Sequence, residues 1–299
     1  MVHAIINPIS GAGADPGVSR RRVAMLEAAA ASRGLDAHIQ LTERSGHARD
    51  LARAAVDAGA EALIVWGGDG TINEAGAALI GSSVVLGVVP AGSGNGLAAA
   101  LGVSREPVTA VADAFDARAH QIDAGIMDGR PFFNIAGIGF DARVAALFNA
   151  RAPGSRGGWP YIVIGVREGC RYSAVDYRVT FDAGPSTTRA LLIAFANGRE
   201  YGIGARIAPN ARLDDGVLDA IVVEDARNIV ARFWHARHLA TGTPERAPMV
   251  TTRRLTHAVI ESDGDMEYHV DGEPGLAHGR IEVSIMPGAL HVRTRSLTG

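Results

Sequence analysis

Short apolar runs alternate with longer stretches of helical periodicity over the first 120 residues of the chain. Such apolar runs are typical of strands that are buried on both faces of a sheet. Helical patterns are predicted from Arg20 to Arg33, from a cap at Ser45 to Gly59, and from Ile72 onwards. The predicted strands are residues 2–6, 38–41, 63–66 and 84–89. This alternation indicates an α/β domain with a doubly wound parallel sheet.

The pattern changes after about residue 120, where strands dominate. A hairpin is predicted around Asp128-Gly129, and Gly137 to Asp141 lead into a predicted helix over 142–150. Further helices are expected at 161–171 and 228–239. The predicted strands are 120–127, 131–136, 175–182, 189–197, 217–224, 256–262, 266–271, 280–286 and 289–294. We therefore expect two domains, an α/β domain over 1–122 and a mostly antiparallel, β-sandwich-like domain over 123–299.

Glycine-rich loops follow the predicted strands at residues 7–13, 67–70 and 90–98. Open α/β sheets bind ligands at the carboxyl ends of their strands, so these loops should meet at one edge of the sheet. Glycine lets a ligand approach the backbone closely, and a helix start aims its N–H groups at a phosphate. A single loop of this kind is equally well explained as a turn, but three such loops favour the binding of a polyphosphate. Asp69 lies in the loop at 67–70, at the carboxyl end of the predicted strand 63–66.

Composition narrows the class of protein. Hydrophobic content is 47% and charged content 20%, as in ordinary globular proteins. A net charge of −3 indicates no nucleic-acid-binding surface. Cys170 is the single cysteine, which excludes an internal disulfide and fits a reducing cytosol. All 29 basic residues are arginine, so there is no P-loop lysine and no lysine general base. We expect no signal peptide and no membrane-spanning segment.

Several acidic residues are candidates for chemistry, and each has a plainer alternative. Glu273 in the Asp271–Glu273 turn is either a general base or a solvated turn acid. Asp215 in a second acidic turn either binds a hard cation or only shapes the bend. Asp141 at a helix start is either an N-cap or a substrate contact. The segment 161–166 either lines a lipid pocket or packs in the core, and Trp159 beside it is a weak signal for membrane contact.

The ordered motifs resemble those of the diacylglycerol kinase catalytic-domain family, which includes bacterial lipid kinases, sphingosine kinases and ceramide kinases. The motifs are NPISG at 7–11, GGDGTINE at 67–74, PAGSGNGLA at 90–98, GIGFD at 137–141, LDDGVLD at 213–219 and DGE at 271–273. The sequence GGDGT of the second loop, taken alone, is also shared with NAD kinases and phosphofructokinases. The ordered set covers nearly the whole chain and is far more specific.

The resemblance implies an enzyme that uses ATP and Mg²⁺ to phosphorylate a lipid hydroxyl, with a NAD-kinase-like α/β domain for ATP. It implies Glu273 as the general base, and Asp69 acting with Mg²⁺ and the phosphates. Asp141 lies where sphingosine kinases place an acid that holds the lipid head group. A structural Mg²⁺ would bind the Asp215 carboxylate and the carbonyl groups of Arg212 and Val217. The implied ATP contacts are Asn7, Pro8, Ile9, Ser10, Gly11, Thr42, Gly67, Gly68, Asp69, Gly70, Thr71, Ile72, Asn73 and Ser93.

One departure leaves the acceptor lipid open. Many bacterial members carry Gly-Thr-x-Asn-Asp in the third loop, where this chain has Gly92 to Gly96 and lacks the second acid. The acceptor is then diacylglycerol or a sphingosine-like lipid, with a role in phospholipid biosynthesis. The alternatives are an NAD kinase or other small-molecule kinase, and a nucleotide-binding regulator without turnover. We expect a cytoplasmic protein that meets its lipid at a membrane surface; peripheral docking and a homodimer stay open.

Overall fold

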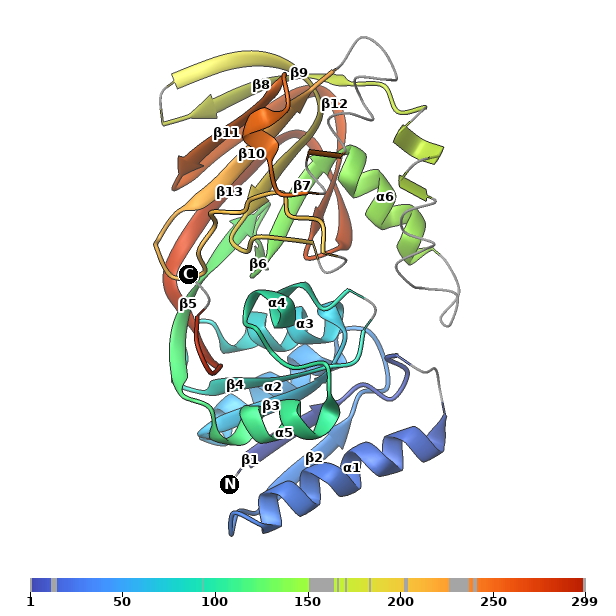
Figure 1. Ribbon diagram of the computed structural model, residues 1–299, viewed down its shortest axis with the longest axis vertical. Helices are drawn as coiled ribbons and strands as arrows, with labels where there is room; N and C mark the ends of the chain where they lie inside the picture. Colours follow the sequence, from blue (N-terminus) through green and yellow to red (C-terminus); the bar gives the residue numbers. More distant parts are fainter. Residues whose placement is uncertain are drawn as a thin grey trace. The chain divides into compact units, whose positions relative to one another are not determined.

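The computed structural model describes residues 2–11, 15–92, 94–150, 164–165, 167–169, 171–182, 184–201, 204–225, 237–238 and 241–297 (Figure 1). Contacts within the chain divide it into two units. The first comprises residues 1–122 and 288–298, and the second comprises residues 123–287. In the described part of the chain, no helix is both long enough and apolar enough to cross a membrane.

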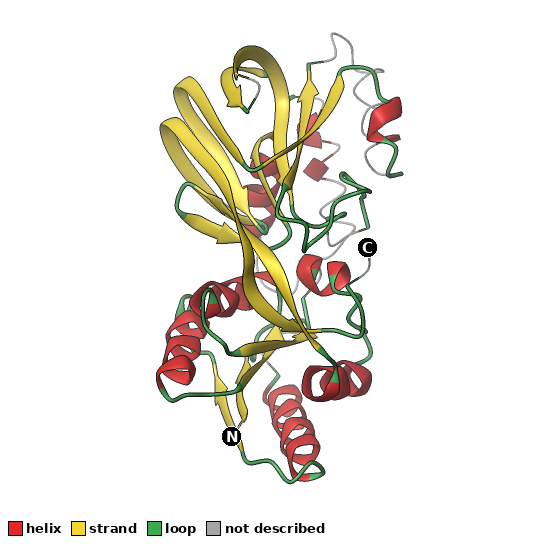
Figure 2. Ribbon diagram, turned by 90° about the vertical axis from the view of Figure 1, so that its left-hand side faces the viewer, coloured by secondary structure: helices red, strands yellow, loops and turns green. Residues whose placement is uncertain are grey.

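The first unit is a parallel sheet with helices on both faces (Figure 2). Its elements are β1 (Val2–Ile6), α1 (Pro16–Ala31), β2 (Ala37–Leu41), α2 (His47–Asp57), β3 (Ala62–Gly67), α3 (Asp69–Leu79), β4 (Val85–Pro90), α4 (Gly96–Ala100), α5 (Pro107–Asp116) and the start of β5 (Ala119–Met127). The strands follow the order β4-β3-β1-β2, with Val65 of β3 paired to Ile5 and Val88. The predicted α/β architecture is therefore confirmed.

Side chains of β3 alternate between the two faces of this sheet, and all of them are buried. Ile64 and Trp66 pack with Leu26 of α1 and Phe115 of α5 in one apolar cluster. Helices α2 and α3 contact each other, and α3 also contacts β3. Burial on both faces explains why β3 reads as a continuous apolar run in the sequence.

The start of α2 differs from the sequence prediction. The N-cap is Gly46 rather than Ser45, and no side chain caps the helix. Gly46 has φ of 78°, which suits glycine, and its N–H donates to Glu74 Oε1 of α3 at 2.8 Å. This contact between helices replaces the predicted serine cap.

The last strand returns to the first unit, although the sequence pattern assigned residues 288–298 to the second domain. Val292 pairs in parallel with Leu86 of β4, and Leu290 and Val292 are fully buried. Thr294 donates its N–H to the carbonyl of Arg118 at 3.1 Å and its hydroxyl to that of Leu101 at 2.6 Å. Apolar alternation predicts a strand but does not indicate which sheet it joins.

The second unit is mostly antiparallel sheet, as predicted. Its elements are the end of β5, β6 (Arg130–Phe132), β7 (Ile135–Gly139), α6 (Phe140–Asn149), β8 (Val175–Phe181), β9 (Gly184–Ala196), β10 (Leu218–Glu224), the 3₁₀ turn η1 (Pro244–Arg246), β11 (Val250–Leu255), β12 (His257–Val270) and β13 (Glu273–Arg293) up to residue 287. The order is β11-β10-β9-β7-β12-β13. Strand β8 also pairs with both β9 and β12, so the sheet curves around a core that includes Phe132, Phe195 and Ile138.

The Asp128-Gly129 hairpin is confirmed, since both residues have positive φ and Met127 pairs with Arg130. The segment 131–136 forms two strands instead of one, because backbone N–H groups of 133–135 bind a side chain, described below. Gly137 to Gly139 belong to β7, and α6 begins at Phe140, two residues before the start of the predicted helix over 142–150.

Some strands that the sequence predicts separately are continuous in the structure. The predicted strands at 256–262 and 266–271 are parts of β12, and those at 280–286 and 289–294 are parts of β13. Strand β11 was not predicted, because most of its residues are exposed and polar. In the predicted helix at 161–171, residues 164–165 and 167–169 are helical, and in that at 228–239 the two described residues, 237–238, are helical. Trp159 and Cys170 lie outside the described residues.

Candidate active site

The glycine loops of the first unit begin side by side at the carboxyl edge of the parallel sheet. The N–H of Asn7, just after β1, donates to the carbonyl of Trp66 at 2.9 Å. The N–H of Ala91, just after β4, donates to the carbonyl of Gly67 at 2.8 Å. The hydrogen-bond ladder thus continues past the strand ends. It brings together three segments that are far apart in the sequence.

The first loop is tied to the second by Asn7. Its side-chain amide donates to Thr71 Oγ1 at 2.8 Å, and its Oδ1 accepts from the N–H of Ile9 at 3.1 Å. Arg22 of α1 also stabilises this loop, because its guanidinium donates to the carbonyl groups of Asn7 and Ser10 at 2.9 Å each. Burial lowers the pKa of Arg22, and its guanidinium lies 5.5 Å from the Trp66 ring centroid.

The second loop is tied to the third by Asp69, the first residue of α3. Its Oδ2 accepts from the N–H of Asn95 at 2.8 Å, and its Oδ1 from the N–H of Gly96 at 2.6 Å. The third loop lies so close to this carboxylate that a Cβ on Gly94 would lie 2.6 Å from Asp69 Oδ2. A Cβ on Gly92 would lie 2.9 Å from the Cα of Gly68. These glycines are therefore required by close approach between loops.

Most of the predicted ATP contacts lie in or beside this loop cluster. Thr42 follows β2 and donates its N–H to the carbonyl of Ile6 at 2.9 Å. The side chains of Ile72 and Asn73 are buried in α3, with exposed fractions of 1% and 8%, so Ile72 offers a ligand only its backbone. Ser93 lies outside the described residues. A helix start directs its N–H groups and its dipole toward an anion, and α3 begins at this edge of the sheet.

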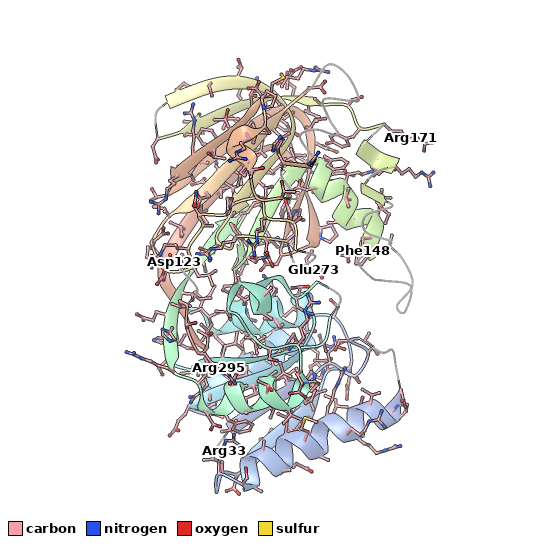
Figure 3. All side chains as sticks on the ribbon, in the orientation of Figure 1. Arg33, Asp123, Phe148, Arg171, Glu273 and Arg295 are labelled. Atoms are coloured by element: carbon pink, nitrogen blue, oxygen red, sulfur yellow. The ribbon has the colours of Figure 1, made fainter. Side chains whose placement is uncertain are left out.

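In the second unit, the Asp271-Gly272 turn displays Glu273 at the start of β13. Val270 pairs with Glu273, and both turn residues have positive φ, as in a two-residue hairpin. The Asp271 carboxylate accepts from the N–H groups of residues 133–135 at 2.9–3.1 Å, which is why β6 and β7 are separate strands. Figure 3 labels Glu273, whose side chain is exposed.

Two more side chains hold this turn in place. Asn149 of α6 donates from its amide to the carbonyl of Gly272 at 2.8 Å. Arg130 donates to the carbonyl of Pro274 at 3.0 Å. Glu273 therefore projects from a backbone that is fixed on both sides, which suits a group that must meet a substrate in one orientation.

Asp141 is buried and is not the N-cap of α6, so that alternative is wrong. The N-cap is Gly139, which has φ of 96°. Asp141 Oδ2 accepts from the Tyr201 hydroxyl at 3.0 Å and lies 3.2 Å from His269 Nε2. Burial and then the Asp141 charge raise the pKa of Tyr172 to about 12. Tyr172 therefore stays neutral near pH 7.

The loop predicted to hold a structural Mg²⁺ is organised by other groups. Asp123 is buried; its N–H donates to the carbonyl of Leu213 at 2.6 Å, and its Oδ2 accepts from the N–H of Gly216 at 2.7 Å. The Asp215 carboxylate is bound by the guanidinium of Arg254, and its Oδ1 accepts from the N–H of Val217 at 3.4 Å.

A metal at this loop would have to displace Arg254 from the only carboxylate that the prediction assigned to it. Among the described residues, no group of three or more His, Cys, Asp or Glu side chains converges on one point. Asp214, the other acid of the turn, is paired with Arg212 at 3.2 Å. A Mg²⁺ bound by the Asp215 carboxylate and the carbonyl groups of Arg212 and Val217 therefore stays a prediction, in which the ion competes with Arg254 for the carboxylate.

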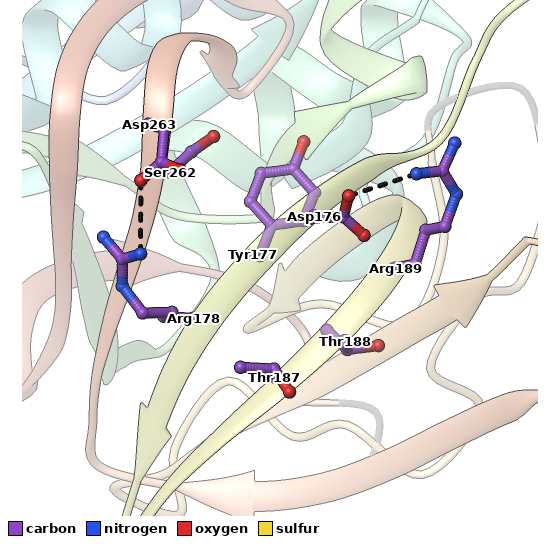
Figure 4. Close-up of a pocket in the computed structure, with 8 residues that line it drawn as sticks. All are labelled: Asp176, Tyr177, Arg178, Thr187, Thr188, Arg189, Ser262 and Asp263. Atoms are coloured by element: carbon purple, nitrogen blue, oxygen red, sulfur yellow. Dashed lines mark hydrogen bonds and ion pairs between the residues drawn. The ribbon is translucent and has the colours of Figure 1, made fainter.

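A separate cavity of about 330 Å³ lies on strands β8, β9 and β12 of the second unit (Figure 4). The arginines that line it form ion pairs with acidic lining residues: Arg178 pairs with Asp263 at 3.2 Å, and Arg189 pairs with Asp176 at 3.1 Å. The lining residues are Asp176, Tyr177, Arg178, Thr187, Thr188, Arg189, Ser262 and Asp263. It contains none of the predicted site residues.

Comparison with models of protein families shows the family to which this chain belongs. Residues 1–127 match the diacylglycerol kinase catalytic domain, and residues 134–294 match the YegS C-terminal NAD kinase beta sandwich-like domain. The chain belongs to the diacylglycerol kinase catalytic-domain family. The glycine loops lie in the first matched range, and Asp141 and the Asp271–Glu273 turn lie in the second.

Relatives of this diacylglycerol kinase family member match it over most of its length. A protein of Mycobacterium tuberculosis named diacylglycerol kinase is 32% identical and covers 97% of this chain and 94% of its own. A protein of Chromohalobacter salexigens named "Probable lipid kinase YegS-like" is 30% identical, covering 84% of this chain and 82% of its own. A solved diacylglycerol kinase structure from Bacillus anthracis has the same fold, with a TM-score of 0.75, 22% identity and coverage of 98% and 96%.

Several residues of the site were missed from the sequence. Arg22, Asp123, His269 and Tyr201 gave no pattern that distinguishes them from surface or core residues, since each has a partner 15 to 128 positions away. Asp271 stood in a quoted motif but was given no role of its own. Its place before a glycine in a predicted hairpin was a usable signal.

Proposed function

We propose that this protein is a lipid kinase that transfers the γ-phosphate of ATP to the hydroxyl group of a lipid. Family membership supports a kinase of lipids. The single structural observation that carries the proposal is the hydrogen-bonded union of three glycine loops at the start of α3. A triphosphate needs several backbone amides at once, and three converging loops offer them without a lysine.

We assign ATP to the first unit. In this assignment Asn7 to Gly11, Thr42, Gly67 to Asn73 and Ser93 contact the nucleotide. Mg²⁺ enters as part of the Mg·ATP substrate and supplies charge neutralisation for the phosphates. Asp69 orients the phosphates and their metal with a carboxylate that also fixes the third loop. No step of this proposal passes through the Asp215 loop, where Arg254 supplies the positive charge.

We assign the lipid to the second unit, with Glu273 as the general base that removes the proton from the attacking hydroxyl. The exposed carboxylate on a fixed turn supports this role. Asp141 is proposed to contact the lipid head group. Because Asp141 already accepts from Tyr201, we expect that contact to involve the same hydrogen-bonded cluster. The acceptor is diacylglycerol or a sphingosine-like lipid.

The proposal is tested with purified protein, Mg²⁺ and ATP labelled at the γ-phosphate. Mixed micelles carry diacylglycerol, sphingosine or ceramide in separate reactions, and NAD is offered without lipid in a further reaction. We expect a labelled lipid from at least one micelle. Formation of NADP would instead assign a small-molecule kinase. Tight ATP binding with no phosphorylated product would assign a nucleotide-binding regulator.

The base assignment is tested by Glu273→Gln. The amide cannot accept the hydroxyl proton, so we expect kcat to fall by about 10²–10⁴-fold with unchanged ATP affinity. The matched control is Glu282→Gln, which changes the same charge on an exposed position of the same strand. A kcat for Glu273→Gln close to that of the control would rule out the base.

A further inference from the structure

His269 connects two parts of the second unit that the proposed function uses separately. It lies on β12, four positions before Glu273, and its side chain is only 4% exposed. Its neighbour on β7 is Gly137, which has no side chain. A Cβ on Gly137 would lie 1.9 Å from Asp141 Oδ2. The absence of that Cβ lets the Asp141 carboxylate lie against β7 and reach the imidazole.

Both ring nitrogens of His269 are engaged, and this assigns the tautomer. The N–H of Gly272 donates to Nδ1 at 3.2 Å, so Nδ1 carries no hydrogen. In the neutral ring Nε2 then carries the hydrogen and donates it to Asp141 Oδ2 at 3.2 Å. The imidazole therefore bridges a buried carboxylate and the backbone of the turn that carries Glu273.

The carboxylate at the other end of this bridge is itself fixed. Asp141 Oδ1 accepts from the N–H of Ala142 at 2.9 Å, and Oδ2 also accepts from the Tyr201 hydroxyl at 3.0 Å. The turn, in contrast, is held by Asp271 and Asn149 in addition to the imidazole. Loss of the His269 contact should therefore displace Gly272 locally without unfolding the hairpin.

We propose that His269 is a positioning residue. It transmits the fixed position of Asp141 to the N–H of Gly272 and so sets where the Glu273 carboxylate lies. The inference rests on the proposed role of Glu273 as the base. It assigns to Asp141 a second task, the orientation of the imidazole that supports the turn.

Two substitutions separate the two halves of the bridge. In His269→Asn, the Oδ1 atom can replace Nδ1 as acceptor for Gly272, while the donor to Asp141 is lost. In His269→Gln, the Nε2 atom can replace the ring donor to Asp141, while the acceptor for Gly272 is lost. Each variant removes one buried hydrogen bond, so their thermal stabilities should fall by similar amounts.

Turnover should separate them if His269 acts on the turn. We expect kcat of His269→Gln to be lower than that of His269→Asn by about tenfold or more, with KM for ATP unchanged in both. Equal kcat values in the two variants, or a greater loss in His269→Asn, would overturn the positioning role. A role in stability alone predicts losses that follow the melting temperatures.

Nuclear magnetic resonance gives a measurement that does not depend on turnover. The ¹⁵N shifts of the His269 ring should show a protonated Nε2 and an unprotonated Nδ1, and the amide of Gly272 should exchange slowly in wild type and rapidly in His269→Gln. Hydrogen on Nδ1 would overturn the proposal. If wild type phosphorylates no lipid, the proposed function fails and this role with it; an active wild type with indistinguishable variants refutes His269 alone.

Discussion

At the scale of single residues, the Asp69 carboxylate has both a proposed chemical role and a structural role. It follows β3 at the sheet edge, where the sequence placed it, and both of its oxygens accept backbone N–H groups of the third loop. The sequence could not predict these partners, because they lie 26 and 27 positions away. A chemical role and a structural role therefore need to be separated by experiment.

We expect Asp69→Asn to lower the free energy of unfolding by about 1–3 kcal/mol, because an amide can replace only one of the two acceptor oxygens. ATP affinity should also fall. Removal of a negative charge alone would favour an anionic ligand, so a weaker affinity would report the displaced loop or the lost metal contact. The measurements are denaturant unfolding and calorimetric titration with Mg·ATP.

The control for this substitution is Asp57→Asn, which removes the same charge at an exposed position near the end of α2. It should leave both quantities unchanged. ATP affinity in Asp69→Asn equal to that in Asp57→Asn would contradict the proposed part of Asp69 in the nucleotide site.

At the scale of elements, the close approach between the second and third loops depends on glycines. Gly92 has backbone atoms of Gly68 where its Cβ would lie, so Gly92→Ala requires one loop to move. We expect a loss of about 1–3 kcal/mol in the free energy of unfolding and weaker ATP binding. Thermal unfolding with and without ATP measures both effects.

Gly264→Ala is the matched control, because nothing lies within 4 Å of its added Cβ and its φ is not in the left-handed region. It should change neither stability nor ATP binding appreciably. If Gly92→Ala behaves like this control, the loops are looser than their contacts indicate and need not act as one site.

Element prediction from the sequence succeeded where one physical cause dominates. Strands β1, β3 and β4 are buried runs, and their apolar patterns fix their location within one or two residues. It failed where a distant side chain decides the local structure. Asp271 divides 131–136 into two strands by binding three N–H groups, and Glu74 sets the start of α2 through Gly46. Neither effect has a signature within the segment whose structure it changes.

At the scale of the whole molecule, the parallel sheet is completed by the last strand of the chain. Leu290 and Val292 are fully buried, and Gly81 donates its N–H to the carbonyl of Ala289 at 3.1 Å. The glycine loops could be predicted because strand order places them at one edge. The pairing of the last strand with the first unit could not be predicted, because the apolar pattern of a strand does not indicate which sheet it joins.

A chain that ends at residue 287 should therefore lose stability chiefly in the first unit. Burial of each of Leu290 and Val292 contributes about 1.5–3 kcal/mol, and this is lost together with the pairing to β4. We expect hydrogen exchange to increase in β3 and β4, and ATP binding to weaken. A chain that lacks only residues 296–299 is the control. Equal protection of β4 in the two chains would contradict the prediction.

The same return has a consequence for synthesis on the ribosome. The 165 residues from 123 to 287 emerge before the segment that completes the first unit. At about 5–20 residues per second, the nascent sheet waits about 8 to 33 s with Leu86 lacking its neighbour. An unpaired strand edge is a template for wrong pairing, so we expect this interval to be when the newly made protein most depends on chaperones.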